Sequence, residues 1–181
     1  LSPIKSHLEL IKKITPDAKT VGVIYNPGEA NSITLVSLLE LEAPGLGLKI
    51  FKAGASNSGA VLSSARSLIG KADAIYVPTD NTIASALEAV IKVGIDGQTP
   101  VFAADTGSVE RGAVAALGFN YYDVGRQTAQ LVAKIFNGTK PGDLAVESPT
   151  ILELYVNPGS AKKMGITIPA DVVSTAKKVI K

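Results

Sequence analysis

Short apolar runs alternate with amphipathic stretches over the first hundred residues, and this alternation predicts the fold. Apolar runs suited to buried parallel strands begin at Val21, Leu48, Ala74 and Pro100, at steps of 27, 26 and 26 residues. Each of the first three is followed by apolar residues at helical spacing, whereas residues 108–111 after the fourth form at most one helical turn. The pattern predicts βαβ units, and hence an α/β fold with an open, mainly parallel sheet and helices on both faces, in a flavodoxin-like three-layer arrangement. Right-handed crossovers would place the carboxyl ends of these strands at one edge.

The same reading places the individual elements along the whole chain. The predicted strands cover residues 20–25, 48–53, 74–77, 100–104, 113–119 and 152–156. The predicted helices cover residues 1–14, with Ser2 as the cap, 31–42, a stretch that opens at 56–59, a stretch from Ile83 to near Gly94, 122–136, 161–164 and 170–178.

The stretch Val21 to Ser32 is the one around which the chain is organised. A strand ends at a turn that contains Pro27 and Gly28, and Asn31 and Ser32 are two candidate caps for the helix that follows. The ligand crevice of an open α/β sheet forms at such a place, and free N–H groups at a helix start favour an anionic group there. Gly28 stands alone and the chain has no GxxxxGK[ST] motif, so the pattern does not favour a nucleotide site.

Composition and charge narrow the classes of function. The chain has 181 residues, 46% hydrophobic, with a net charge of +2 and no cysteine. We therefore expect a globular protein without a nucleic-acid partner, a disulfide or a thiolate site. No apolar run approaches the roughly 20 residues that span a bilayer. The chain begins at Leu1 and its one methionine is Met164, so we expect a processed product or part of a longer protein.

No catalytic or metal-binding set is recognisable in the sequence. The one histidine, His7, is expected to be an exposed residue of the first helix. The motifs GxSxG, HExxH and CxxC are absent. A serine triad needs a histidine and no serine motif stands near His7, while one histidine, no cysteine and scattered carboxylates do not favour a metal site. We expect no catalysis and no cofactor.

Polar residues gather where the predicted strands end, and they form the candidate site. They are Glu29, Asn31 and Ser32 after the first strand, Thr79, Asp80 and Asn81 after the third, and Asp105 after the fourth. Such residues commonly cap helices and form turns. However, two carboxylates, Asp80 and Asp105, suit a ligand ammonium, while the helix start at Asn31 suits a ligand carboxylate. The hypothesis is a site for a zwitterion.

Four segments carry a resemblance to a known family. They read VGVIYNPGEANS, YVPTDN, PVFAADTGSVERGAVAALGFNYYDVGRQTA and VNPGSAKKMGITIP. Together they resemble ABC-transporter substrate-binding proteins related to tryptophan- and tyrosine-uptake lipoproteins. The resemblance implies the type I periplasmic-binding-protein fold, in which two α/β lobes joined by three hinge crossings close on a small ligand.

The resemblance also implies how the chain is divided. Residues 1–117 would form the second lobe, 118–148 would return to the first lobe, and 149–181 would cross the hinge and complete the second lobe. Most of the first lobe would be missing. The apolar face of residues 122–136 would then be covered by unusual packing, by dimerisation or by strand exchange between chains.

The roles implied by the resemblance complete the prediction. Asn31 and Ser32 match the helix start that contacts ligand, Asp80, Asn81 and Asp105 match the loops after the third and fourth strands, and Tyr121 lies at a hinge crossing. Tyr121 would line the cleft or be a buried packing residue. The partners would be an amino-acid-like ligand and an ABC permease, in an extracytoplasmic location that is periplasmic or lipid-anchored. The alternatives are the ligand-sensing domain of a regulator and a flavodoxin-like enzyme domain.

Overall fold

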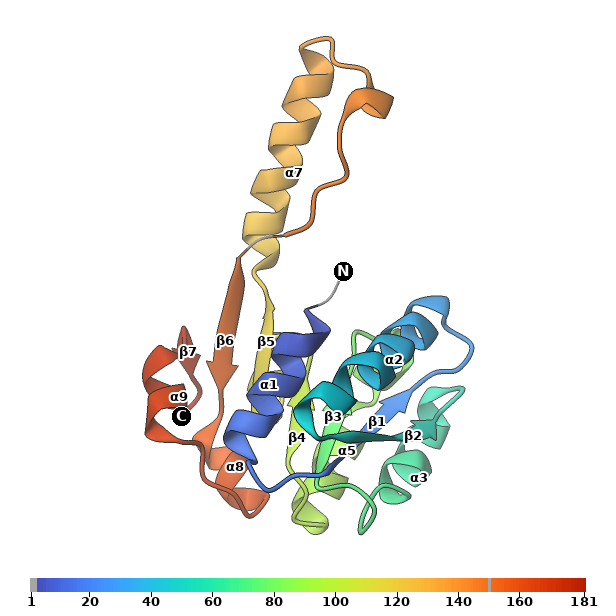
Figure 1. Cartoon of the computed structure of the whole chain (residues 1–181), viewed down its shortest axis with the longest axis vertical. Coiled ribbons are helices and arrows are strands. Elements are labelled where there is room, and N and C mark those ends of the chain that lie inside the picture. Colours follow the sequence, from blue (N-terminus) through green and yellow to red (C-terminus); the bar gives the residue numbers. More distant parts are fainter. Residues whose placement is uncertain (1–2, 150) are drawn as a thin grey trace.

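The computed structural model describes residues 3–149 and 151–181, and within them the strands form one seven-stranded sheet (Figure 1). The strand order is β2-β1-β3-β4-β5-β6-β7. All neighbouring pairs are parallel except β5 with β6, so the predicted mainly parallel sheet is confirmed. The strands are β1 (Thr20–Tyr25), β2 (Lys49–Gly54), β3 (Ala74–Val77), β4 (Val101–Ala103), β5 (Ala115–Phe119), β6 (Leu152–Val156) and β7 (Lys178–Val179).

Helices cover both faces of the sheet, as predicted. The α-helices are α1 (Ile4–Ile14), α2 (Ala30–Glu42), α3 (Val61–Arg66), α4 (Asn81–Ser85), α5 (Leu87–Asp96), α6 (Gly107–Glu110), α7 (Tyr121–Phe136), α8 (Pro158–Lys163) and α9 (Ala170–Thr175). Short 3-10 helices are η1 (Ala43–Leu46), η2 (Ser58–Ala60) and η3 (Pro141–Asp143). Helices α1 and α2 pack together on one face, and α3 packs with α5 on the other.

The agreement between predicted and observed boundaries differs from element to element. Three predicted strands, β1, β3 and β6, have the predicted bounds, because their apolar runs end at clear turn residues. The predicted helix after the third strand is broken at Ala86 into α4 and α5. The last predicted helix, 170–178, is wrong at its end, because α9 stops at Thr175 and Lys178 pairs with Tyr155 in the sheet. The predicted cap Ser2 lies outside the described residues.

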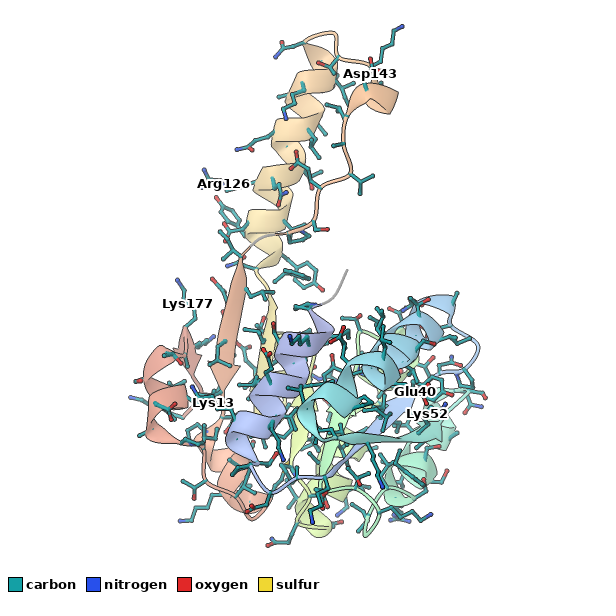
Figure 2. All side chains as sticks on the ribbon, viewed as in Figure 1. Lys13, Glu40, Lys52, Arg126, Asp143 and Lys177 are labelled. Carbon is teal, nitrogen blue, oxygen red and sulfur yellow. The ribbon has the colours of Figure 1, made fainter. Side chains whose placement is uncertain are left out.

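The core is apolar on both sides of the sheet. The strands β3 and β4 are buried at every position, as expected of central parallel strands. Helix α1 contributes one apolar face, on which Ile4, Leu8, Ile11 and Ile14 are all buried. Ion pairs such as Lys52–Glu40, at 2.7 Å, lie at the surface (Figure 2) and contribute little to stability. Among the described helices, none has the length and apolar character that a membrane crossing needs.

Helix α7 projects away from the sheet, and the chain returns through η3 to β6 (Figure 1). No residue of α7 is buried against the described chain. Its sequence is nevertheless amphipathic, and several of its large apolar side chains face solvent: Tyr121, Tyr122, Val132, Ile135 and Phe136, the last at 86% exposure. The described part of the chain therefore leaves the apolar face of this helix uncovered.

Candidate ligand-binding site

The candidate site lies at the switch point of the sheet, where the chain stops adding strands on one side of β1 and continues on the other side. The strand order β2-β1-β3 places the reversal between β1 and β3, which pair in parallel. Ligand crevices of doubly wound sheets form beyond the carboxyl ends of the strands at such a point. The loops that leave β1 and β3, together with the first residues of α2 and α4, contain six of the predicted site residues, so the topology brings these residues to one edge of the sheet.

Asp80 is a buried residue that connects the two loops through hydrogen bonds. Its carboxylate accepts hydrogen bonds from the backbone N–H of Asn26 at 2.6 Å, the hydroxyl of Ser32 at 2.6 Å and the backbone N–H of Ile83 at 2.9 Å. The residue is 2% exposed and Ser32 is fully buried. The expectation that Asp80 and Ser32 contact a ligand therefore does not fit, because protein donors occupy the carboxylate and water does not reach it.

Glu29 makes a second connection between the loops. Its carboxylate accepts bonds from the backbone and side-chain N–H groups of Asn81 and from the backbone N–H and hydroxyl of Thr82. Partial desolvation acts to raise the pKa of Glu29, but these hydrogen bonds outweigh it and lower the pKa from its ordinary value. Glu29 and Asn81 thus hold the start of α4 against the start of α2.

The start of α2 differs from the prediction. Asn31 and Ser32 are not caps, because the helix begins at Ala30 and Glu29 is the residue that precedes it. The side chain of Asn31 donates to the carbonyl of Thr79 at 3.1 Å, and both residues are exposed. Within the described chain no side chain caps α2, so the N–H groups of its first turn keep the free donors of an uncapped helix start. This is the feature that a ligand carboxylate would need.

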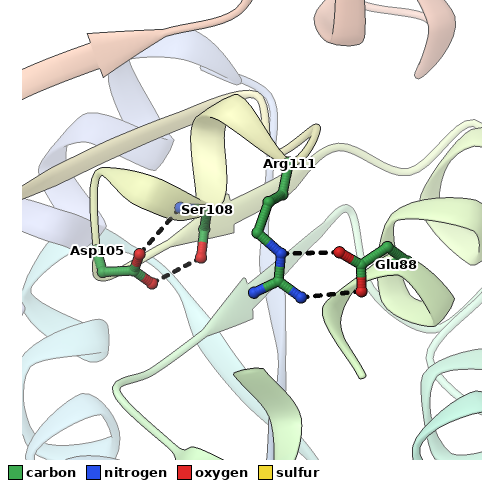
Figure 3. Close-up of polar contacts among 4 residues, drawn as sticks. All are labelled: Glu88, Asp105, Ser108 and Arg111. Carbon is green, nitrogen blue, oxygen red and sulfur yellow. Dashed lines mark hydrogen bonds and ion pairs between the residues drawn. The ribbon is translucent and has the colours of Figure 1, made fainter. Parts of the chain in front are cut away.

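Asp105 lies after β4 at the same edge of the sheet and is partly exposed. Its carboxylate accepts the backbone N–H of Ser108 at 2.9 Å and the Ser108 hydroxyl at 2.6 Å (Figure 3). Nearby, Arg111 donates two hydrogen bonds to Glu88, at 2.8 and 2.9 Å, and these bonds lower the pKa of Glu88 to about 2. Because Arg111 is engaged by Glu88 and each Asp105 oxygen accepts one hydrogen bond from Ser108, the Asp105 carboxylate keeps lone pairs for a cationic group.

Tyr121 is the first residue of α7 and follows β5, so it lies beyond the same edge. It is 74% exposed, and the alternative of a buried packing tyrosine does not fit the described chain. The preceding residue, Asn120, caps α7 by accepting the backbone N–H of Tyr122 at 2.9 Å. The Asn120 amide also donates to Glu153 of β6 at 3.3 Å. These bonds fix where α7 begins.

The sequence reading missed three residues that shape the site. Asn26 and Thr82 are joined by a 2.8 Å hydrogen bond and were not among the candidates. His7 was expected to be exposed, and this is wrong, because the residue is 3% exposed. Burial lowers the pKa of His7 to about 4, despite its hydrogen bond with the carbonyl of Leu117. The helical spacing of Ile4, His7 and Leu8 was the signal that could have placed His7 on the buried face.

Two grooves of about 370 Å³ lie outside the loops that follow β1 and β3. One lies along α7 and has Asn120, Arg126 and Glu147 in its walls. The other lies beside residues 14–18 and Asp73, which precede β1 and β3 and so mark the amino edge of the sheet. Neither contains a predicted site residue. The candidate site is therefore assigned from its polar groups and not from a groove. These groups are the uncapped start of α2 and the partly exposed carboxylate of Asp105, which lie at the same edge of the sheet.

The chemistry of this edge is that of non-covalent recognition. Three or more potential metal-ligating side chains do not meet anywhere in the described residues. The uncapped start of α2 offers N–H donors for an anion, and Asp105 offers acceptors for a cation. The class that this arrangement fits is a small-molecule binding protein with an α/β fold.

Comparison with known proteins gives the family. The profile of the ABC transporter substrate binding protein family matches residues 1–180. The chain belongs to this family, and the resemblance seen in the motifs is confirmed. A crystal structure of a conserved domain protein from Vibrio cholerae is 46% identical, with a TM-score of 0.93 over 99% of this chain and 61% of its own. The ABC domain in complex with L-Trp from Streptococcus pneumonia is 32% identical, with a TM-score of 0.88 over 99% and 62%.

A curated relative adds a functional name. The "Tyrosine-binding protein" of Clostridioides difficile is 37% identical over 161 residues, which are 89% of this chain and 47% of that protein. The structural neighbours have the type I periplasmic-binding-protein fold, which confirms the predicted fold class. The family consists of solute-binding proteins and not of enzymes. The chain spans about half the length of the curated relatives it matches and about three-fifths of the solved chains.

Proposed function

We propose that this chain is the ligand-binding lobe of an ABC substrate-binding protein and that it binds an amino acid, with no catalysis. The observation that carries the proposal is the uncapped start of α2 at the same edge as the Asp105 carboxylate. A relative named for tyrosine binding and a neighbour solved with L-Trp support an aromatic amino acid as the ligand.

The proposed contacts divide the predicted residues into two groups. The start of α2, with Asn31, receives the ligand carboxylate, Asp105 receives the ammonium group, and Tyr121 packs against the ligand side chain. Glu29, Ser32, Thr79, Asp80 and Asn81 hold the loops in place, because their polar atoms already bind protein partners. The direct contacts are thus fewer than the sequence suggested.

The proposed division into lobes explains the exposed face of α7. Residues 1–117 and 149–181 form one lobe, and residues 118–148 belong to a first lobe. The neighbouring structures superpose on 99% of this chain, which includes α7, and about two-fifths of each neighbour lies outside the match. A lobe of that size would cover Tyr122, Ile135 and Phe136 and complete the cleft. Dimerisation or strand exchange would cover the same face by other means, and the mass of the particle in solution separates these cases.

The proposed transport role follows from the family. ABC substrate-binding proteins work outside the cytoplasm, and we propose the same location, with a lipid anchor and an ABC permease as the docking partner. Ligand would shift an equilibrium between open and closed arrangements of the lobes, and the closed form would dock on the permease.

Ligand analogues test the proposed contacts. Calorimetric titration would use the chain alone and the chain joined to a first lobe, with L-tyrosine, L-tyrosinamide and N-acetyl-L-tyrosine. We expect the two-lobed protein to bind L-tyrosine, and to bind each analogue at least about tenfold more weakly, because each lacks one charged partner. Equal binding of all three compounds would contradict the zwitterion site. No binding of any amino acid by the two-lobed protein would contradict the proposed function.

A further inference from the structure

His7 is a buried polar residue that joins three elements of the fold. Its Nε2 lies 2.7 Å from the carbonyl oxygen of Leu117 in β5, and its Nδ1 lies 2.5 Å from the hydroxyl of Tyr76 in β3. A carbonyl only accepts, so Nε2 carries the hydrogen and donates it, and the neutral ring therefore accepts the Tyr76 hydrogen at Nδ1. Both side chains are almost fully buried, at 3% and 1% exposure. We call these two side chains the His7–Tyr76 bridge.

The bridge ends at the point where the chain leaves the lobe. Leu117 is followed by Gly118, the residue at which β5 passes the loop after β4. A Cβ on Gly118 would lie 3.0 Å from the carbonyl oxygen of Ala104 and 3.2 Å from the backbone nitrogen of Thr106. These two residues flank Asp105. The backbone of Gly118 therefore passes close to the loop that holds the Asp105 carboxylate, with no room for a side chain between them, so a shift of the Leu117 carbonyl would reach that loop.

The Asp105 side is also linked to the bridge through charge. The pKa of Tyr76 is raised, first by burial and then by the negative charge of Asp105, so the two side chains are electrostatic neighbours. The Asp105 loop is thus connected to the bridge in two ways, through its close approach to Gly118 and through the interaction of Asp105 with Tyr76.

We propose that the His7–Tyr76 bridge is a positioning device that sets the Asp105 loop and the start of the crossing, residues 117–120, in the arrangement that binds ligand. The part that concerns ligand rests on the proposed function. His7 itself touches no ligand. A buried polar pair adds little net stability compared with apolar packing of the same volume, so its defined geometry is what it contributes.

Amide hydrogen exchange on the 181-residue chain tests the bridge without a ligand. His7→Leu removes both hydrogen bonds, whereas His7→Gln supplies one donor and one acceptor. We expect His7→Leu to raise exchange rates about tenfold at residues 106–108 and 118–120, with little change in α3 and α5, and His7→Gln to restore rates near wild type. Lys13→Ala is the matched control. Lys13 lies on the same helix as His7, and its replacement breaks only an exposed ion pair with Asp171 of α9.

Tyr76→Phe covers the case in which His7→Leu does not fold, since it removes only the hydroxyl. It should raise exchange at the same two segments by a smaller factor. Equal rates at these segments in wild type and Tyr76→Phe, or an increase spread evenly over the sheet, would overturn the proposal.

The ligand arm uses the two-lobed protein. We expect His7→Leu to weaken amino-acid binding about tenfold and His7→Gln to bind within about twofold of wild type. Unchanged binding in His7→Leu would overturn the claim that the bridge sets the ligand site. If the wild-type protein binds no amino acid, the proposed function fails, while the exchange experiment still decides whether the bridge positions the two segments.

Discussion

Replacing Asp80 by Ala tests whether this residue is a brace of the fold. The substitution removes the acceptor of two backbone N–H groups, that of Ile83, which is buried, and that of Asn26, which is partly buried, and of the Ser32 hydroxyl. The hydroxyl can rotate to another acceptor, but the two N–H groups cannot. A buried donor without a partner costs roughly 1–3 kcal/mol, so two of them cost about 3 kcal/mol after partial relaxation. The loss includes the cap of α4, since the Ile83 bond is that cap.

Urea unfolding followed by circular dichroism would measure the change in the free energy of unfolding. About 3 kcal/mol corresponds to a fall in Tm of roughly 6–12 °C for a chain of this size. The matched control is Asp105→Ala, which removes a partly exposed acceptor of Ser108 and should cost about 1 kcal/mol. A loss below 1 kcal/mol for Asp80→Ala, or a larger loss for Asp105→Ala, would refute the reasoning.

Three further predictions concern other parts of the chain. In the folded state the pKa of His7 is about 4, below the unfolded value of 6.5, so the contribution of the neutral side chain to stability is fully present above pH 6.5 and falls by about 3 kcal/mol as the pH drops to 4. Urea unfolding at several pH values should show this fall. A His7→Gln variant whose free energy of unfolding depends on pH in the same way would contradict it. Gly118→Ala should destabilise the folded chain by roughly 1–3 kcal/mol in thermal unfolding, because the new Cβ would lie too close to the Ala104 carbonyl oxygen. Gly125→Ala should not, because a Cβ at Gly125 would meet open space. Equal effects of the two substitutions would contradict the close approach at Gly118. Phe136→Asp should reduce any self-association of the 181-residue chain in sedimentation, because Phe136 is 86% exposed on α7; unchanged association would mean that this face is not involved.

The sheet could be predicted because its signals are local. Apolar runs such as residues 20–25 and 74–77 are bounded by turn residues, and their even spacing already implies parallel pairing. The strand at Lys178 could not be predicted in this way. It has two residues and exists because it pairs with Tyr155 and Val156, which is a contact that no local pattern encodes.

The candidate site was predictable in its place but not in the roles of its residues. Asp80 and Asp105 follow strands in the same manner, and the sequence gives them the same role. The structure separates them, because Asp80 is enclosed by donors from the neighbouring loop and Asp105 meets only its own helix start. The prediction that His7 is exposed was wrong because it relied on the polarity of the residue and of its neighbours. A histidine among polar neighbours reads as exposed unless its position on the apolar face of α1 is given more weight than its polarity.

The measurement that tests the central claim most directly is calorimetric titration of L-tyrosine into the two-lobed protein and its Asp105→Asn variant. In the proposed site the Asp105 carboxylate lies against the ligand ammonium. Asn keeps the size and one acceptor but loses the charge, so we predict binding at least about tenfold weaker while the protein remains folded. An Asp105→Asn protein that binds L-tyrosine as tightly as wild type would contradict the assignment of this edge as the amino-acid site.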